Sequence, residues 1–357
     1  MVDKKNINTH KTQTICQQND TSVLADCLLQ WFALNGRDMP WRVKGKAHEN
    51  AYAVWISEIM LQQTTVKTVL DYFPRWMQRF PTIEALAQAD IDDVLHCWQG
   101  LGYYTRAKKI HECAQLIMQK YNGIIPNNRD ELLKLPGIGP YTASSICAFA
   151  FNQPETVVDG NVIRVIARLY GLTHAVTKEE IYEIAKQITP QNHGADYASA
   201  IMDLGATVCT PEKPKCTDCP WQQYCIAHQK NIAEQIPLIN KPQKKIKTGY
   251  LYLIQDETGA YYIEKRQGKG LLSGLYEFPW QENQETYPLF PSSDWIKTDK
   301  SIKHTFTHFQ LTLNIVQTQI ERKNNPLKNG FFIPKTEFKN YAFSTLMKKV
   351  IKLIDKE

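Results

Sequence analysis

Four cysteines lie within 17 residues of one another, in the pattern C-x6-C-x2-C-x5-C. They are Cys209, Cys216, Cys219 and Cys225. In a reducing compartment, thiols at this spacing favour a bound metal over disulfides. Zinc takes four sulfurs tetrahedrally and an iron–sulfur cubane also takes four cysteines, so the spacing predicts a metal centre without choosing between them. Either centre would lock the loop 209–225, and we predict that its Lys213 and Lys215 meet a phosphate backbone.

Two carboxylates stand in contexts that suit acid–base chemistry. Glu58, in VWISEIMLQQT, has apolar neighbours in a helical stretch, and burial of an unpaired glutamate is costly. We therefore expect a basic partner or a raised pKa that keeps the carboxyl protonated. Asp159, in VVDGN, precedes a helix that Asn161 could cap, although the aspartate itself is an alternative cap. A protonated glutamate and an ionised aspartate are the pair that cleaves glycosidic bonds.

The segment LPGIGPYTASS, residues 135–145, places two glycines and two prolines in five residues between helical stretches. Gly137 and Gly139 would let the backbone approach a ligand closely, because they have no Cβ. The amides of the turn and of the next helix, with the positive end of its dipole, suit a phosphate. The pattern indicates a nucleic-acid contact, although a tight helical corner would need glycine as well.

Helical segments must position these residues. Apolar residues at helical spacing recur from residue 22 to residue 205, with short connections and no strand signal. The expected helices include SVLADCLLQWFAL, YTASSICAFAF and NVIRVIARLYGL. Thr177 and Glu180 predict a capping box at the start of another. We therefore expect an all-α domain at residues 21–228, after a flexible tail at 1–20.

The pattern changes after residue 228. Residues 229–247 lose helical spacing and gain lysine and proline, which indicates a linker. GYLYLIQDETGAYYIEKR predicts a hairpin around DETG, HTFTHFQLTLNIVQTQI alternates as a strand does, and YAFSTLMKKVIKLIDK predicts an amphipathic helix. The second domain is therefore expected to be α+β, at residues 248–357.

Composition narrows the function classes. The 357 residues are 43% apolar, and no run approaches the roughly 18 apolar residues of a membrane span. The polar N-terminus has no apolar signal segment, so we expect a cytoplasmic protein without a membrane partner. Residues 1–228 hold 22 basic and 23 acidic side chains, and residues 229–357 hold 20 and 13. DNA binding by the first part would therefore depend on local features.

Together these motifs resemble a known family. LPGIGPYTA, the aspartate of VVDGN and the four-cysteine loop resemble the endonuclease III superfamily of DNA glycosylases. SEIMLQQT, GLGYYTRA, MDLGATVCTP and KHTFTHFQL are similar to the MutY family of adenine DNA glycosylases. The resemblance is strong over residues 22–228 and looser over 248–350. It implies a two-lobed helix–hairpin–helix glycosylase domain, with the hairpin motif at about 131–150, and one 4Fe–4S cluster at the cysteines.

The same resemblance implies the substrate and the reaction. A monomer would bind double-stranded DNA, flip adenine opposite 8-oxoguanine or guanine out of the stack, and remove it. Glu58 would protonate the departing adenine at N7 and help to position water. Asp159 would stabilise the oxocarbenium-like sugar, by its charge or by a transient covalent bond. Tyr141 and Asn161 would line the site beside them.

Further residues would contact DNA. The resemblance implies this role for Leu61, Gln62, Gln63, Thr64, Tyr103, Gly137, Gly139, Lys213 and Lys215. Leu61 and Gln63 would fill the duplex at the lesion, and Tyr103 would stack at 8-oxoguanine. The alternatives are a core position for Leu61, a solvated side chain for Gln63 and a packed aromatic ring for Tyr103.

The second domain resembles the Nudix-like domain of this family. GLLSGLYEFPW keeps the leading part of a Nudix box, but the glutamate-rich metal-binding segment is missing from the sequence, so we expect recognition without nucleotide hydrolysis. The resemblance implies that Phe306, Thr307 and His308 read the lesion. The family usually has serine where this chain has Thr307, which keeps the hydroxyl and adds a methyl group.

Other functions would need other residues. A β-lyase acting on oxidised pyrimidines needs a lysine in the first turn after the hairpin, to form a Schiff base. This chain has Tyr141 there and no lysine between Lys134 and Lys178, so we expect weak or no strand cleavage. A thymine glycosylase could share the tyrosine, but the long second domain and Glu58 argue against it. A non-catalytic DNA-binding protein would not need both carboxylates.

Overall fold

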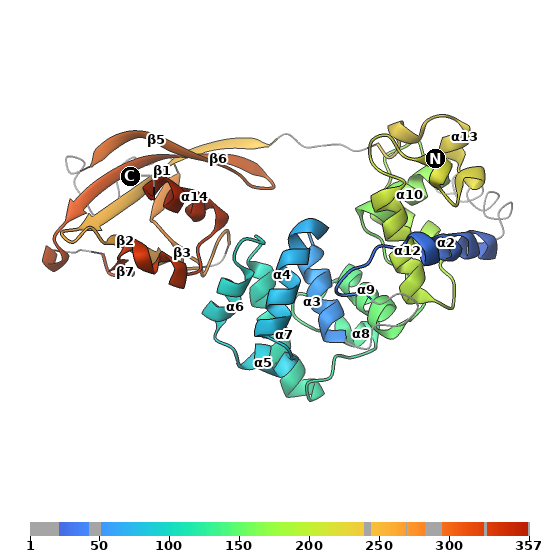
Figure 1. Cartoon of the computed structure of the whole chain (residues 1–357), viewed down its shortest axis with the longest axis horizontal. Helices are drawn as coiled ribbons and strands as arrows, with labels where there is room; N and C mark the ends of the chain where they lie inside the picture. Colours follow the sequence, from blue (N-terminus) through green and yellow to red (C-terminus); the bar gives the residue numbers. More distant parts are fainter. Residues whose placement is uncertain are drawn as a thin grey trace, which may run out of the picture. The chain divides into compact units, whose positions relative to one another are not determined.

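The computed structural model describes residues 21–42, 51–238, 244–268, 270–282, 295–324 and 327–355 (Figure 1). The expected tail at residues 1–20 lies outside them. The chain divides into two compact units. Unit 1 holds residues 1–87 and 112–240, and unit 2 holds residues 88–111 and 241–357. Unit 2 therefore includes a short segment from within the helical part of the sequence.

The first part of the chain is helical, as the apolar spacing predicted. Its helices are α2 (Thr21–Asn35), α3 (Ala51–Leu61), α4 (Val66–Arg79), α5 (Ile83–Gln88), α6 (Ile91–Trp98), α7 (Thr105–Tyr121), α8 (Arg129–Leu132), α9 (Pro140–Phe151), α10 (Gly160–Leu169), α11 (Lys178–Ile188), α12 (Gly194–Thr207) and α13 (Ile226–Gln229). The short 3₁₀ helices η1 (Cys216–Asp218), η2 (Gln222–Tyr224) and η3 (Ala233–Gln235) follow α12 or α13.

Polar side chains set where several helices begin. The Thr65 hydroxyl accepts from the amide of Thr68 at the start of α4, which separates α3 from α4 within a continuous apolar pattern. The Thr177 hydroxyl accepts from the amide of Glu180 at 3.1 Å, so the predicted cap of α11 is present. In a full capping box the Glu180 side chain would bond back to the amide of Thr177. Here the Glu180 carboxylate instead binds the His174 ring at 2.8 Å.

The core of unit 1 brings α2, α10, α11 and α12 together. Buried Leu28, Ile166 and Leu204 pack in it. The Trp221 indole nitrogen donates to the carbonyl of Leu24 at 2.8 Å, which fastens the cysteine loop to α2. Helix α12 also contacts α9, and α9 contacts α3. Helix α12 thus joins α10 to α9, which lies against α3.

The structure corrects the start of the expected linker. Ile236 is 3% exposed and belongs to the core of unit 1, and its carbonyl accepts from the Arg168 guanidinium at 2.9 Å. Sequence periodicity missed this segment because one buried side chain on a 3₁₀ turn leaves no repeating pattern. Residues 239–243, also within the expected linker, lie outside the described residues.

Unit 2 carries a mixed sheet, which confirms the α+β expectation. Its strands are β1 (Lys245–Asp256), β2 (Tyr261–Lys265), β3 (Tyr276–Glu277), β4 (Trp280–Glu282), β5 (Ile296–Thr305), β6 (Phe309–Ile320) and β7 (Gly330–Ile333). The order is β3-β2-β1-β6-β5, with β4 paired to β1 and β7 to β2. Strands β1 and β6 run parallel, from Lys245 opposite Phe309 to Asp256 opposite Ile320. The 3₁₀ helices η5 (Arg322–Asn324) and η6 (Lys335–Asn340) precede the final helix, α14 (Thr345–Ile354).

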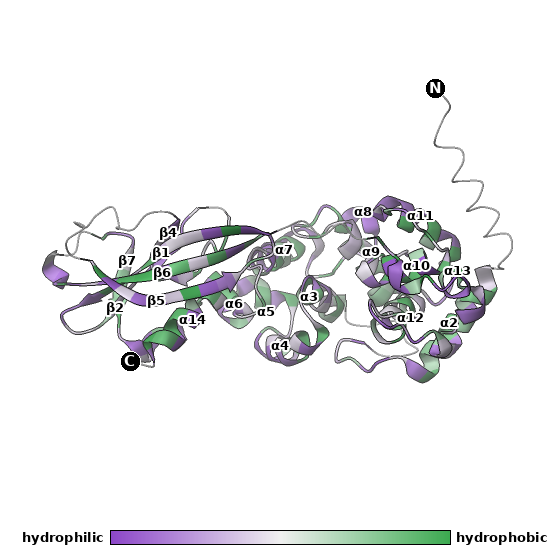
Figure 2. Ribbon diagram, turned by 90° about the horizontal axis from the view of Figure 1, so that it is seen from above, coloured by the Kyte–Doolittle hydropathy of each residue, from purple (hydrophilic) through white to green (hydrophobic). Residues whose placement is uncertain are grey.

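The apolar side chains of the sheet are covered by α14, whose ribbon alternates between hydrophobic and hydrophilic residues (Figure 2). The predicted hairpin around DETG joins β1 to β2, and the Asp256 carboxylate accepts from the amides of Thr258 and Ala260. The predicted strand at 304–320 is wrong at its start. The chain reverses at residues 306–308, between β5 and β6. No helix in the described ranges has the length and apolar character needed to cross a membrane.

Candidate active site

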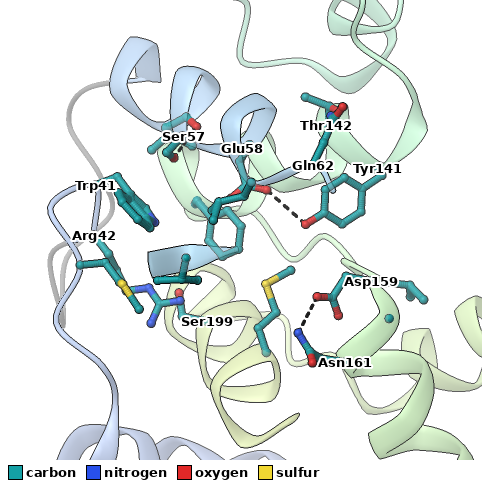
Figure 3. Close-up of a pocket in the computed structure, with 18 of the residues that line it drawn as sticks. Trp41, Arg42, Ser57, Glu58, Gln62, Tyr141, Thr142, Asp159, Asn161 and Ser199 are labelled. Carbon is teal, nitrogen blue, oxygen red and sulfur yellow. Dashed lines mark hydrogen bonds between the residues drawn. The ribbon is translucent and has the colours of Figure 1, made fainter. Parts of the chain in front are cut away.

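A pocket of about 720 Å³ lies in unit 1, between α3, α9, α10 and α12 (Figure 3). A volume of this size suits a small organic group such as a nucleobase with its sugar. The structure brings ten of the predicted residues together in its wall: Glu58, Leu61, Gln62, Gln63, Thr64, Gly137, Gly139, Tyr141, Asp159 and Asn161. Residues separated by a hundred positions in the sequence therefore share one cavity.

Glu58 is buried in the last turn of α3, with 6% of its surface exposed. Burial raises the pKa of its carboxyl to about 7, and the nearby Asp159 adds to this rise. The hydroxyls of Ser145 and Tyr141 and the charge of Arg42 act in the opposite direction. The Tyr141 hydroxyl donates to Glu58 Oε2 at 3.2 Å. The carboxyl is therefore held in place and is partly protonated near neutral pH.

Asp159 caps helix α10. Its Oδ1 accepts from the amide of Val162 at 2.8 Å, and its Oδ2 accepts from the Asn161 side-chain amide at 2.9 Å (Figure 3). The expectation that Asn161 could cap this helix is wrong, because Asn161 lies in the first turn. The alternative, in which Asp159 is the cap, is present in the structure. The Asp159 side chain therefore lies at the positive end of the helix dipole, is oriented by two donors and lines the pocket.

Hydrogen bonds connect Asp159 to the cysteine loop. The Arg164 Nη2 donates to Asn161 Oδ1 at 2.9 Å and to the Gly205 carbonyl at 2.6 Å. The Arg164 Nε donates to the carbonyl of Cys209 at 2.7 Å. A continuous chain thus runs from the Asp159 carboxylate through Asn161 and Arg164 to Cys209. This chain fixes the orientation of the carboxylate relative to the loop.

The turn before α9 needs one of its two glycines for conformation. Gly137 has φ 78°, in the left-handed region. Gly139, the N-cap of α9, has φ −94°, and a Cβ added there would meet nothing within 4 Å. The protein's own packing therefore leaves room at Gly139, beside the pocket. No side chain caps the first turn of α9, which leaves this end suited to an anion.

The sequence prediction missed a buried ion network in the pocket wall. Asp203 has no exposed surface, and its carboxylate accepts from Arg37 Nη2 at 2.7 Å and from Arg42 Nη1 at 2.8 Å. Although burial alone would raise it, the charge of Arg42 and the bonds from both arginines lower the pKa of Asp203. Arg37, Arg42 and the neighbouring Trp41 line the pocket. Asp203 stands among apolar residues in MDLGATVCTP. A charged residue within an apolar helical stretch is the signal that singled out Glu58, and the same signal could have identified Asp203.

The four predicted cysteine ligands line one small cavity, together with Arg168. Arg168 is 2% exposed, and its Nη1 donates to Cys209 Sγ at 3.4 Å and to the Thr210 carbonyl at 2.7 Å. Across the described residues, no three His, Cys, Asp or Glu side chains form a group that could hold a single metal ion. Four thiols around one cavity are a donor set that fits an iron–sulfur cluster.

Some predicted residues lie outside the pocket wall. Lys213 and Lys215 belong to the cysteine loop, where the amide of Lys213 donates to the Glu234 carboxylate at 3.1 Å. Tyr103 belongs to unit 2, where it is 41% exposed and its hydroxyl bonds to that of Thr307. Phe306 and His308 flank Thr307 in the same β5–β6 turn. The structure therefore groups these four residues of unit 2 at one place.

Known proteins share this architecture. Residues 56–191 match the HhH-GPD superfamily of base excision DNA repair proteins, and residues 249–353 match the NUDIX domain. Adenine DNA glycosylase from Rattus norvegicus is 32% identical over 406 residues, covering 94% of this chain and 78% of the rat protein. Adenine DNA glycosylase from Buchnera aphidicola subsp. Baizongia pistaciae (strain Bp) is 37% identical, covering 82% of this chain and 85% of the bacterial protein.

A solved structure agrees with the helical part. A thermostable thymine-DNA glycosylase is 27% identical, with a TM-score of 0.54, over 60% of this chain and 99% of that protein. The similarity is therefore to a helical glycosylase fold, to which this chain adds its Nudix-like domain. The rat and Buchnera proteins are 32% and 37% identical to this chain over most of their own length and of its length, which shows common family membership and not the fold alone. The chain belongs to the adenine DNA glycosylase family, within the HhH-GPD superfamily of base excision DNA repair proteins.

Proposed function

We propose that this chain removes adenine mispaired with 8-oxoguanine or guanine from double-stranded DNA, by hydrolysis of the N-glycosidic bond. The observation that carries the proposal is the pocket in which the buried carboxyl of Glu58 and the capped carboxylate of Asp159 share one wall. A base can reach such a pocket only after it leaves the duplex stack. The rat and Buchnera relatives, both named adenine DNA glycosylase, support adenine as the base.

Glu58 acts as the general acid. Adenine leaves poorly as an anion, so a proton must reach it as the bond breaks. A carboxyl whose pKa is about 7 holds that proton at neutral pH and releases it readily. The bond from the Tyr141 hydroxyl to Oε2 fixes one carboxyl oxygen, so that the other is directed to the base and afterwards to a water molecule.

Asp159 stabilises the sugar as positive charge develops on it. A fixed anion is most effective when it needs no reorganisation, and two donors already orient this carboxylate. The charge of Asp159 also contributes to the raised pKa of Glu58, so the aspartate supports the protonated state that the acid needs.

The pocket favours base removal without strand cleavage. Tyr141 occupies the first turn of α9, and burial, followed by the charges of Glu58 and Asp159, raises the pKa of its hydroxyl well above the usual value. It therefore stays protonated, and a phenol has no amine with which to form a Schiff base. Among the described residues that line the pocket, one is a lysine, Lys178, which lies at the exposed start of α11. Any residual lyase activity would depend on that amine.

The pocket wall offers contacts for a purine. Asp203 holds the guanidinium groups of Arg37 and Arg42 in place, so their remaining N–H donors are preorganised for acceptors on a base edge. Trp41, 7% exposed, gives an apolar face beside them. Fixed donors and a flat apolar face are the features with which proteins bind an extruded base.

One 4Fe–4S cluster would be held by Cys209, Cys216, Cys219 and Cys225. When bound, it would supply the cross-link that holds the loop 209–225. Arg168 would donate to the sulfur of Cys209, and Trp221 already ties the same loop to α2. Lys213 and Lys215, carried by this loop, would meet the DNA backbone.

Unit 2 would read the base opposite adenine. Tyr103 presents an exposed ring on which a base can stack, and the Thr307 hydroxyl can donate to or accept from 8-oxoguanine. Phe306 and His308 would complete that surface. The Nudix-like domain, without its glutamate-rich segment, would serve for recognition only.

A strand-cleavage assay on duplexes with 8-oxoguanine·A tests the proposal. Product that forms only after alkali supports a monofunctional adenine glycosylase, cleavage without alkali would indicate a lyase, and no product would reject catalysis. Truncation tests the reading role of the Nudix-like domain. The cut belongs after residue 243, because Ile236 packs in the core of unit 1. Removal of 244–357 should reduce the preference for 8-oxoguanine·A over G·A more than it reduces the rate on G·A.

A further inference from the structure

The turn that joins α3 to α4, residues 61–64, lines the pocket and carries an unusual backbone conformation. Gln63 is exposed and has φ 57°, in the left-handed region that residues with a Cβ rarely adopt. Such a conformation persists only where neighbouring contacts hold it, and it is concentrated at functional positions. Within the turn, the Thr64 amide donates to the Leu61 carbonyl at 3.3 Å and the Thr64 hydroxyl donates to the Gln62 carbonyl at 3.4 Å. Both bonds are long, so a contact from outside the turn can add to its stability.

The adjacent Gln62 provides that contact. Its Nε2 donates to Thr142 Oγ1 at 3.0 Å, and Thr142 is 2% exposed. Burial of one partner shields the bond from competing water. The bond crosses from the C-terminal end of α3 to the first turn of α9, and both side chains are visible beside the pocket in Figure 3.

A second bond joins the same two helix ends. Glu58 lies in the last turn of α3, and Gln62, four residues later, directly follows the last residue of that helix. Tyr141 and Thr142 are neighbours at the start of α9, and Tyr141 donates to Glu58 at 3.2 Å. Two successive residues of α9 thus bind Glu58, in the last turn of α3, and Gln62, directly after that helix. The 61–64 turn and the carboxyl of Glu58 share one support.

We propose that Gln62 is a positioning residue whose bond to Thr142 holds the 61–64 turn in the shape that lets a base pass into the pocket. The inference rests on the proposed function and adds a residue to it. Loss of the bond releases the left-handed conformation at Gln63, and the turn then samples other shapes. Glu58 keeps its own bond to Tyr141, so entry of the base is slowed and the acid itself is unchanged.

Isosteric variants separate these effects. Gln62→Met and Thr142→Val each remove the bond and keep the side-chain size, and Thr142→Ser keeps the hydroxyl. Thr189→Val is the matched control. It removes another threonine pair in unit 1, the bond of 3.0 Å between Thr156 and Thr189, neither of which lines the pocket. All variants are measured as full chains on duplex DNA.

Two signals are recorded on one duplex. Fluorescence of 2-aminopurine placed beside the target adenine reports unstacking, and quenched samples report single-turnover excision at several pH values. We expect Gln62→Met and Thr142→Val each to slow both signals by about three- to tenfold, the size of one lost hydrogen bond. The double variant should be no slower than either single variant, because both remove the same bond. Thr142→Ser and Thr189→Val should resemble the wild type, and the pH midpoint of excision should not move.

Three results would overturn the positioning role: additive losses in the double variant, slower excision with normal unstacking, or a Thr142→Ser variant as slow as Thr142→Val. If Thr142→Val does not fold, Gln62→Met and Thr142→Ser decide between the outcomes. A wild type that unstacks the duplex without excising adenine would count against the proposed function and not against this inference.

Discussion

The substitution Glu58→Gln should abolish excision and at the same time make the protein more stable at alkaline pH. The carboxyl of Glu58 has a pKa of about 7 in the folded chain, against 4.5 when it is exposed. Between these values the unfolded chain ionises Glu58 while the folded chain keeps it protonated. Folding then takes up a proton, so the free energy of unfolding decreases as pH rises through this window.

The structure gives the size of the effect. A difference of 2.5 pKa units corresponds to about 3 kcal/mol, lost between pH 4.5 and about pH 7. Glutamine has nearly the shape of the protonated acid, can keep the bond from Tyr141, and does not ionise. The variant should therefore match the wild type near pH 4.5 and exceed its unfolding free energy by up to about 3 kcal/mol at pH 8.

The pH dependence of excision should also report the ionisation of Glu58. As a general acid, Glu58 is active when protonated, so excision should fall about tenfold from pH 6 to pH 8, with a midpoint near 7. Single-turnover rates from pH 5 to pH 9 measure the midpoint, and urea unfolding of both proteins at pH 5 and pH 8 measures the stability difference. Glu282→Gln, which removes an exposed carboxylate paired with Lys247 on the sheet, is the control and should change neither excision nor its pH profile.

Burial also raises the pKa of Glu277 in unit 2 to about 7, so the pH dependence of the wild type contains a second contribution. The difference between the unfolding free energies of the wild type and Glu58→Gln does not contain that contribution, because Glu277 is present in both proteins. A variant no more stable than the wild type at pH 8 would refute the reasoning. So would an excision rate that increases with pH, because Glu58 would then act in its ionised form.

The remaining predictions concern the other parts of the site. Asp159→Asn should lower excision by about a hundred- to a thousandfold and leave duplex binding intact in a gel-shift assay, since asparagine still caps α10; near-wild-type excision would remove Asp159 from the mechanism. Thr307→Val should reduce the preference for 8-oxoguanine·A over G·A by about two- to tenfold, while Thr307→Ser should keep it, as competing-substrate rates will show. Cys219→Ser should remove the brown colour of the purified protein and lower its melting temperature, and an unchanged absorption spectrum would argue against an iron–sulfur cluster.

How much of the site was predictable depends on how local its signal is. Glu58 was found because a charged residue interrupts an apolar helix, and that signal needs only a few neighbours in sequence. The cysteines were found by spacing within one loop. The network around Asp203 was missed because its partners, Arg37 and Arg42, lie more than 160 positions away. The two arginines come close to Asp203 only when α12 packs against α2 in the folded protein.

The errors in the fold have the same origin. The sequence keeps mixing aromatic and polar residues through the turn at 306–308, and this hairpin end contains neither glycine nor proline to mark a reversal. The two consecutive polar residues Thr307 and His308 are the one interruption of the alternation there. Periodicity therefore predicted one strand where the chain reverses. The turn between β5 and β6 is set by pairing, with the Phe306 amide donating to the Phe309 carbonyl at 2.8 Å. Strand pairing of this kind is a long-range property that a window along the sequence does not contain.

The two interpretations of Asp159, as a helix cap or as a catalytic anion, turn out to be one arrangement. A cap must be ionised or polar, fixed in rotamer and held at the positive end of a helix. A carboxylate that stabilises a developing cation needs the same three properties. Asn161 and the amide of Val162 use one oxygen each, which leaves the remaining lone pairs free to face the pocket. Because Arg164 extends this support to Cys209, a change in the cysteine loop should reach the carboxylate through the start of α10 and not through the pocket wall.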